Sequence, residues 1–449
     1  MLTPLFDIPE GDAMLGASSA LSEQVLLRAL TQQLPAIEAA EKPFVGCRVV
    51  NALYQPSRAL MLAVALLDDV AIPDDRLWPE GRIVYLQSPV RSPVSRRGKA
   101  IDILGQPFEA YVFPNDRRLR SLRNLAGSED AQTFWRSLFS LPTDENAELK
   151  RQLLRYAPEQ KFVARLRDRA SNVEQQRDGV AVRICDAQRA AELVDRHKSA
   201  RKLLKHRPRS LDVPRMIGGD AAAGIIAIEW IKGDGLLQTL AAGDATSVLA
   251  LLAQSLHDFH QMAMPDLSAV TSSSLASMAD AAASDLGMAC PQLFPALASL
   301  LSRITARLRN VETVTPATIH NDFYFDQVRV RKHRCTIVDL ERVATGDPLI
   351  DVANFVCQMR MLPYRPQFGV NACEANRWAD LFLEKWQRTT STTIDADRLA
   401  AYSAVSALVL ARGMMRHLRP GWKTIVHHCI AQAESLLAST TENPVPRFA

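Results

Sequence analysis

The sequence predicts an α+β protein in which antiparallel sheets precede a largely helical C-terminal part. Short runs rich in β-branched and aromatic residues, bounded by Pro, Gly or Asn, occur at 82–90 and 107–113, which is typical of strands. Beyond residue 235, apolar residues recur at helical spacing, as in 245–262 and 294–311. The length of 449 residues favours two or three domains.

The first 145 residues are predicted to form an N-terminal α/β domain. This part combines the two strand-like runs with a longer apolar run at 59–67. A helix is predicted from Asp116 onward, because Leu119, Leu122 and Leu125 recur at roughly helical spacing. The polar, proline-containing stretch 140–150 marks the expected boundary. Nothing in these residues specifies a role.

A change of character at residue 146 begins a second domain, expected to cover 146–234. Three short apolar runs (152–158, 161–166 and 179–185) are separated by polar turns, which predicts a small antiparallel sheet. A helix is expected at 187–204, followed by strands at 213–218 and 224–231. Residues 235–449 are then expected to be helical, except where two short strand-like runs flank polar loops at 317–345.

Composition excludes several classes of protein. A formal net charge of +4 over 449 residues is too small for a nucleic-acid coat, so no nucleic-acid partner is expected. Two basic stretches are interpreted as the solvated faces of helices, with an anion site as the alternative. They comprise Arg117, Arg118, Arg120 and Arg123, and Arg196, Lys198, Arg201, Lys202 and Lys205.

Cysteine usage and hydropathy indicate a cytoplasmic protein with no membrane partner. The seven cysteines include no C-x-x-C pair, and their spacings match no zinc pattern. Several lie in apolar runs, as buried thiols do in a reducing compartment. The N-terminus carries acids where an export signal has positive charge. The longest apolar run, 60–67, is far shorter than the roughly 20 residues that cross a bilayer.

The segment most informative about chemistry lies between 317 and 355, where short strand-like runs flank loops that contain Asp, Asn and Gln. Asp322 follows a strand-like run, Gln327 lies five residues later, and a predicted hairpin then delivers Asp339 at the end of its second strand. One carboxylate therefore precedes the hairpin and another follows it, at the same edge. Two acids brought together in this way suit a metal ion and a substrate hydroxyl.

At these residues the sequence resembles the aminoglycoside phosphotransferase family of the protein-kinase-like superfamily. That family has H-x-D-x-x-x-x-N, then a strand ending in I-D-[FW]-[DE], then G-D-P-x-x-D. The matching residues are His320-Asn321-Asp322, Gln327, Val338-Asp339-Leu340-Glu341, Gly346-Asp347-Pro348 and Asp351. The resemblance extends more loosely over 150–440 and does not cover the first 145 residues. It implies a bilobal protein-kinase-like fold with an N-lobe at 146–234 and a C-lobe at 235–449.

The resemblance assigns roles to the matching residues. Asp322 would orient the substrate hydroxyl and accept its proton, and His320 would brace the catalytic loop around it. Asp339 would bind the metal that bridges the phosphates. Gln327 stands where the family has a metal-binding Asn, and its amide oxygen offers the same ligand type. Glu341 would be a further metal-site acid or a plain surface acid.

The same resemblance places nucleotide-binding residues in the N-lobe. Arg183 occupies the position of the family's phosphate-binding Lys, with Glu192 or Asp195 as its ion-pair partner. The segment from Glu229 to Ile231 resembles the hinge whose backbone grips adenine, although a buried strand meeting a turn predicts the same letters.

Two other features bear on the resemblance, one in agreement and one as a departure from many kinases. Asp351 is expected to hydrogen-bond the backbone of the catalytic loop. The first turn of the N-lobe, residues 157–160, lacks the glycine pattern that covers phosphates in many kinases.

The implied activity is an ATP-dependent phosphotransferase that uses ATP, or GTP in its place, with Mg²⁺ and a small-molecule hydroxyl acceptor such as a sugar, an amino sugar or another alcohol. The alternative is a pseudokinase that acts as a nucleotide-binding scaffold, which Arg183 and Gln327 favour. A protein-substrate kinase is disfavoured, because only six residues separate Glu341 from Pro348. The C-terminal helices are not conspicuously acidic, so an aminoglycoside acceptor is not the first choice. The candidate roles for the N-terminal domain are to cap the site, to shape the acceptor pocket or to form a homodimer.

Overall fold

The computed structural model describes residues 21–38, 43–69, 82–90, 97–125, 149–168, 179–205, 210–311 and 314–439. The chain folds into two compact units. The first unit comprises Met1–Val194, Arg215–Trp230 and Arg416–Pro420, and the second comprises Asp195–Pro214, Ile231–Met415 and Gly421–Ala449. The boundary expected at 140–150 lies largely outside the described residues.

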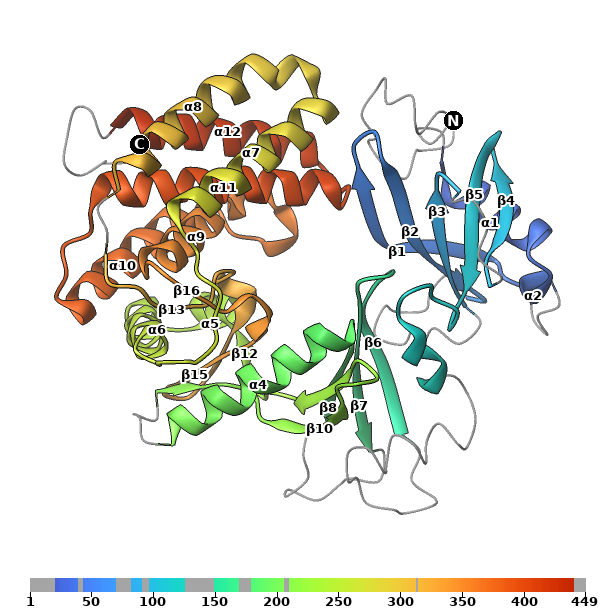
Figure 1. Cartoon of the computed structure of the whole chain (residues 1–449), viewed down its shortest axis with the longest axis horizontal. Coiled ribbons are helices and arrows are strands. Elements are labelled where there is room, and N and C mark those ends of the chain that lie inside the picture. Colours follow the sequence, from blue (N-terminus) through green and yellow to red (C-terminus); the bar gives the residue numbers. More distant parts are fainter. Residues whose placement is uncertain are drawn as a thin grey trace. The chain divides into compact units, whose positions relative to one another are not determined.

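The first unit begins with two helices and an antiparallel sheet (Figure 1). The helices are α1 (Glu23–Gln33) and α2 (Pro35–Glu38). The strands are β1 (Gly46–Gln55), β2 (Ala59–Leu67), β3 (Ile83–Ser88), β4 (Lys99–Ile103) and β5 (Gln106–Val112), in the order β1-β2-β3-β5-β4. Every residue of β2 is buried, which explains the apolar run at 59–67. The helix expected from Asp116 is a 3₁₀ turn, η3 (Arg120–Leu125), as far as the chain is described.

A second antiparallel sheet of the first unit has the order β10-β11-β8-β7-β6. Its strands are β6 (Leu149–Ala157), β7 (Lys161–Asp168), β8 (Val180–Ile184), β10 (Met216–Asp220) and β11 (Ile225–Glu229). The predicted antiparallel sheet is therefore present. Helix α4 (Ala187–Leu204) begins in the first unit and ends in the second. Ala190 and Leu193 of α4 pack against Ile226 of β11.

The two sheets of the first unit share one hydrophobic core. This cluster joins residues of β2 and β3, such as Ala63 and Tyr85, to residues of β7 and β8, such as Phe162 and Val182. Phe113, just after β5, lies 5.8 Å from Phe162 between ring centroids. One face of each sheet is therefore buried against the other, as in a β-sandwich.

The second unit is largely helical, as predicted. Its helices are α5 (Leu236–Ala242), α6 (Ala245–His260), α7 (Ser272–Ala289), α8 (Phe294–Arg309), α9 (Leu349–Arg360), α10 (Ala372–Thr390), α11 (Ala396–Arg416) and α12 (Trp422–Ser439). Short 3₁₀ turns are η4 (Pro291–Leu293), η5 (Phe325–Gln327), η6 (Leu340–Arg342), η7 (Leu362–Tyr364) and η8 (Pro366–Phe368). No helix among the described residues is both long enough and apolar enough to cross a membrane.

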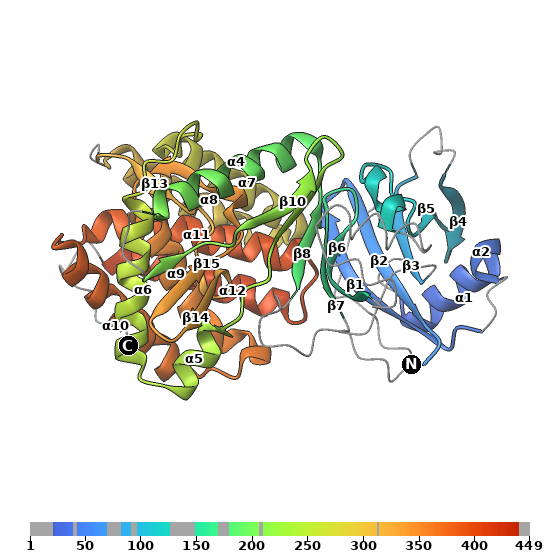
Figure 2. The same ribbon diagram turned by 90° about the horizontal axis from the view of Figure 1, so that it is seen from below.

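Two small sheets lie among these helices (Figure 2). One has the order β12-β14-β15-β9, from β12 (Asp234–Gly235), β14 (Val328–Arg331), β15 (Arg334–Ile337) and β9 (Leu211–Asp212). The other pairs β13 (Ala317–Ile319) with β16 (Ala344–Gly346). The predicted hairpin is β14–β15, with Val328 opposite Ile337 and Arg331 opposite Arg334. Gly233 has φ +148°, and a Cβ there would lie 2.8 Å from the Val330 carbonyl oxygen, so only glycine allows β12 to approach β14.

None of the seven cysteines forms a disulfide. Six are buried and Cys373 is exposed. Burial raises the pKa of the Cys335 and Cys357 thiols to about 12, so both are un-ionised at neutral pH. These cysteines therefore act as small apolar core residues.

Candidate active site

The loop after β13 is held by a buried aspartate at the start of α9. Asp351 is completely buried, and its two carboxylate oxygens accept hydrogen bonds from the backbone N–H groups of His320 (2.7 Å) and Asn321 (2.8 Å). The hydrogen bonds predicted for Asp351 are therefore present. Both lie directly before Asp322, so they fix the backbone that carries this residue.

His320 joins this loop to the end of β15. Its Nε2 lies 2.9 Å from the carbonyl oxygen of Val338, and since a carbonyl only accepts, Nε2 carries the proton. The backbone N–H of Val338 in turn donates to the carbonyl of Gln327 (2.9 Å). Asp322 follows His320 by two residues, and Asp339 follows Val338 directly. The structure thus brings together the segments that carry His320, Asp322, Gln327 and Asp339.

Backbone conformation at this cluster is unusual in two places. Asn321 and Asp339 have φ values of 58° and 57°, in the left-handed region. Asn and Asp adopt this region more readily than other non-glycine residues, because their short side chains bond locally. Asp322 and Asp339 are half-buried, while Gln327 is 8% exposed. Such conformations concentrate at functional sites, where surrounding contacts hold them.

Aromatic side chains pack around the loop that carries Asp322 and restrict its motion. The ring of Phe323 lies 6.0 Å from that of His320 and 5.7 Å from that of Phe355 on α9. The side-chain amide of Asn354 donates to the Phe323 carbonyl at 2.9 Å. Asp322 therefore projects from a loop whose neighbours on both sides are fixed.

Sequence reasoning missed His260 as a supporting residue. The side chain of His260 is 1% exposed and its Nε2 lies 3.1 Å from the Asp351 carboxylate. Asp351 thus holds α6 as well as the loop. The only signal was a histidine on the last turn of a helix, which by itself indicates nothing specific.

The prediction that both basic stretches form solvated helix faces was wrong for some of their residues, beginning with Arg196 and Arg201. Arg196 of α4 donates to the carbonyl oxygens of Leu340 and Glu341, directly after Asp339. Arg201, further along α4, forms an ion pair with Asp212. Long basic side chains reach partners distant in sequence, so helical periodicity alone cannot place them.

The donor set near Asp339 is compatible with Mg²⁺. Among the residues that the structure describes, no group of three His, Cys, Asp or Glu side chains could hold a metal ion by itself. Mg²⁺ commonly takes only one or two carboxylates, with the remaining ligands from water and substrate phosphates. Asp339 and the amide oxygen of Gln327 fit that requirement, and the half-buried Glu341 stands two residues beyond Asp339.

Of the predicted nucleotide-binding residues, Arg183, Glu192 and Glu229 belong to the first unit, whereas Asp195 and Ile231 belong to the second. Arg183 lies on β8 opposite Ile226, on the face that α4 covers. Glu192 is exposed and accepts a hydrogen bond from Gln188 at 3.1 Å.

In the segment proposed as the hinge, the side chain of Glu229 forms an ion pair, whereas the backbone groups of Ile231 are not hydrogen-bonded within the described part of the chain. Glu229 forms a two-pronged ion pair with Arg215, with both contacts at 2.9 Å. Ile231, in the second unit, is half-buried, and its backbone groups make no hydrogen bond to the described residues.

The first turn of the second sheet is fixed by residues of the N-terminal part. Glu159 pairs with Arg117 (2.9 Å) and accepts from the hydroxyl of Tyr85 (3.1 Å), so the solvated interpretation was also wrong for Arg117. Asp116 accepts from the backbone N–H of Glu159 (3.0 Å) and from the hydroxyl of Tyr156 (2.8 Å). Burial, and then these acids, raise the pKa of both tyrosines far above the ordinary value, so both hydroxyls remain donors.

A mixed α+β fold with this loop-and-hairpin site is that of a kinase-like phosphotransferase. The model of the phosphotransferase enzyme family (APH) matches residues 162–402, more than half of the chain, and the chain belongs to this family. A comparison with curated proteins found no match.

Among solved structures, aminoglycoside phosphotransferase APH(4)-Ia is 13% identical, with a TM-score of 0.47 over 69% of this chain and 97% of that one. A thermostable mutant of the same enzyme, in ternary complex with ADP and hygromycin B, is 15% identical with a TM-score of 0.49 over 69% and 99%. A choline/ethanolamine kinase family protein from Mesorhizobium loti is 16% identical with a TM-score of 0.48 over 70% and 95%.

Proposed function

We propose that this phosphotransferase transfers the γ-phosphoryl group of ATP, or of GTP, to a hydroxyl group of a small molecule. The observation that carries the proposal is the hydrogen bond from His320 to Val338, because it joins the loop of Asp322 to the strand that delivers Asp339. Two carboxylates held on fixed neighbouring segments suit the two tasks of phosphoryl transfer, which are to orient the nucleophile and to hold the metal.

Each residue of the cluster has a distinct task in this proposal. Asp322 accepts a hydrogen bond from the acceptor hydroxyl and takes its proton as the oxygen attacks. Asp339 and Gln327 would hold Mg²⁺ through their side-chain oxygen atoms, with Glu341 as a further acid near Asp339. When bound there, the ion would supply neutralisation of the charge on the phosphate oxygens. His320 has its Nε2 proton committed to Val338, so its role is to position the loop rather than to transfer protons.

The nucleotide is proposed to engage residues from the middle and from the end of the N-lobe sequence. Arg183 offers a guanidinium that binds phosphate with parallel hydrogen bonds, and Glu192 is its proposed ion-pair partner. The free backbone groups of Ile231 suit the edge of an adenine or guanine base, next to the backbone of Glu229. The acceptor is a small alcohol, sugar or amino sugar, and the protein acts in the cytoplasm.

Substitution of the two acids tests the catalytic assignment. Asp322→Ala should lower the rate of ADP formation by at least about 100-fold, since a positioned base contributes roughly that much. Asp339→Ala should do the same and should also abolish the Mg²⁺-dependent rise in melting temperature that ATP produces, which Asp322→Ala should retain.

Asp326→Ala is the matched control, because Asp326 is an exposed residue on the same loop. Partial burial of its carboxylate, opposed by Arg365 and Arg329, raises the pKa of Asp326, but no catalytic task is assigned to it. The rate of ADP formation by this variant should stay within about twofold of that of the unchanged chain, because surface substitutions usually have small effects. Normal turnover in either acid variant would refute the assignment.

The alternative is a nucleotide-binding protein without catalysis. It is favoured by Gln327 at the metal position, because the extra methylene makes its amide less rigid than that of Asn. A Mg²⁺-dependent thermal shift with ATP or GTP, combined with no ADP release for any acceptor in a panel of hydroxyl metabolites, would favour this alternative.

A further inference from the structure

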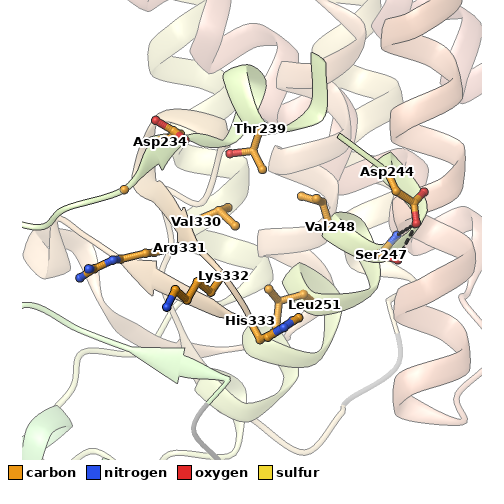
Figure 3. Close-up of a pocket in the computed structure, with 11 residues that line it drawn as sticks. Asp234, Thr239, Asp244, Ser247, Val248, Leu251, Val330, Arg331, Lys332 and His333 are labelled. Atoms are coloured by element: carbon orange, nitrogen blue, oxygen red, sulfur yellow. Dashed lines mark hydrogen bonds between the residues drawn. The ribbon is translucent and has the colours of Figure 1, made fainter. Parts of the chain in front are cut away.

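A pocket of about 430 Å³ opens in the second unit, at the turn of the β14–β15 hairpin (Figure 3). Its walls come from β12, from α5, from the first turns of α6 and from residues 330–333 of the hairpin. Val330, Val248 and Leu251 form an apolar floor. The volume lies within the usual range for small-molecule sites, roughly 300–1,000 Å³.

The hairpin turn lines this pocket with three basic side chains, Arg331, Lys332 and His333. All three are exposed, and none forms a hydrogen bond or ion pair with another described side chain. Neighbouring arginines of the same hairpin do have partners. Arg334 pairs with Asp212 at 3.1 Å, and Arg329 donates to backbone carbonyls. The charged groups of Arg331 and Lys332 and the imidazole of His333 are therefore available to a ligand.

Two acids also line the pocket, and one of them is already engaged. Asp244 caps the N-terminus of α6 and accepts from the backbone N–H of Thr246 (2.9 Å) and from the hydroxyl of Ser247 (2.5 Å). The Ser247 hydroxyl, followed by the Thr246 N–H, holds the pKa of Asp244 below its usual value. Its charge is directed at the positive end of the helix. Asp234, at the opposite rim, is the remaining acid.

We propose that this pocket binds a small organic anion, with an aliphatic or aromatic body on the apolar floor and a phosphate or carboxylate against the basic turn. The long side chains of Arg331 and Lys332 can rotate over the rim to meet the anion. Four residue pairs separate this turn from Gln327 and Val338 at the other end of the hairpin, roughly 13 Å along the strands. The pocket is therefore distinct from the proposed metal site, and the proposal does not depend on catalysis.

Calorimetric titration of the full chain with phenyl phosphate tests this proposal, in the presence of saturating ADP and Mg²⁺ to occupy the nucleotide site. The triple variant Arg331→Gln, Lys332→Gln, His333→Gln should bind at least about tenfold more weakly, since it loses both charged side chains and the imidazole of the wall. Val248→Phe should abolish binding by filling the floor. Inorganic phosphate and benzyl alcohol, which each supply half of the ligand, should bind at least about tenfold more weakly than phenyl phosphate.

The matched control is Arg309→Gln, which removes an exposed arginine at the end of α8 and should leave the affinity unchanged. Melting temperatures within about two degrees of the unchanged chain would show that the variants fold. Phenyl phosphate that fails to bind, or that binds equally to the triple variant and Val248→Phe, would overturn the proposal. Equal affinity for inorganic phosphate would overturn the ligand class.

Discussion

Asp351 is the residue on which most of the catalytic loop depends. It accepts from the backbone N–H groups of His320 and Asn321 and lies beside His260, with no exposure to solvent. Asp351→Asn keeps the shape of the side chain but replaces one of its accepting oxygens with an NH₂ group. That NH₂ group would face a backbone N–H, so two donors would lie opposite each other. We expect the loop to loosen, with a loss of about 10- to 100-fold in kcat and a cost of about 2 kcal/mol in the free energy of unfolding.

Steady-state kinetics and urea unfolding measure both quantities. Asp397→Asn is a suitable control, because it alters a carboxylate that is largely exposed and pairs with Arg307. Exposed ion pairs contribute about 0–1 kcal/mol, so this control should change little. An Asp351→Asn variant with unchanged kcat would show that the loop does not need this support.

At the residue scale, the spacing of the motifs along the sequence predicted which segments come together, but it did not predict which other side chains contact them. The order of Asp322, Gln327, Asp339 and Asp351 along the chain was enough to predict one local cluster. The role of His260 was not predictable, because its partner lies 91 residues away. The left-handed backbone at Asp339 was also hidden, since Asp is compatible with many conformations.

The turn between β6 and β7 is the element whose geometry depends most on a distant segment. Asp116 accepts from Tyr156, from the backbone of Glu159, and from the backbone N–H groups of Arg118 and Leu119. Asp116→Ala leaves these buried donors without an acceptor, so we expect a loss of about 2–4 kcal/mol in the stability of the first unit. Hydrogen exchange at 156–160 should accelerate with it.

Asp220→Ala provides the comparison, because it removes a single exposed turn hydrogen bond, to the backbone of Ala223, in the same unit. Its effect should stay below about 1 kcal/mol. If exchange at 156–160 is the same in both variants, Asp116 does not hold the turn.

At the element scale, most helices and strands of four or more residues were predictable, but strands of two residues were not. The helix expected at 187–204 agrees with α4 at both ends, and the runs at 59–67, 82–90 and 107–113 correspond to β2, β3 and β5. Strands β9 and β12 have two residues each, too few to show any period. The expected helix after Asp116 begins as a 3₁₀ turn, because Asp116 binds the backbone of 118–119 and directs Leu119 and Leu122 into the shared core.

The shared core of the first unit predicts how a shortened chain behaves. Removal of residues 1–145 would expose the apolar face of the second sheet, including Phe162, Leu166, Val182 and Ile184, all buried in the full chain. At about 1.5–3 kcal/mol for each large side chain, this loss equals a large part of the roughly 5–15 kcal/mol that stabilises a typical domain. We expect the 146–449 chain to aggregate or to bind a hydrophobic dye.

Size-exclusion chromatography and dye fluorescence, with the full chain as reference, measure this outcome. A shortened chain that is monomeric and unfolds cooperatively would contradict the prediction. The sequence could not reveal this dependence, since which two sheet faces meet is decided by contacts between residues far apart along the chain, such as Phe113 and Phe162.

The hydrophobic core that the two sheets share also limits where this protein could be divided or fused without loss of packing. The stretch that matches the family begins at residue 162, inside β7, so its edge cuts through a sheet whose buried side faces the preceding strands. A gene fusion or chimera joined at residue 162 would separate the two sheet faces that pack against each other. The structural unit is therefore larger than the stretch that matches the phosphotransferase family, because the two sheets share one core.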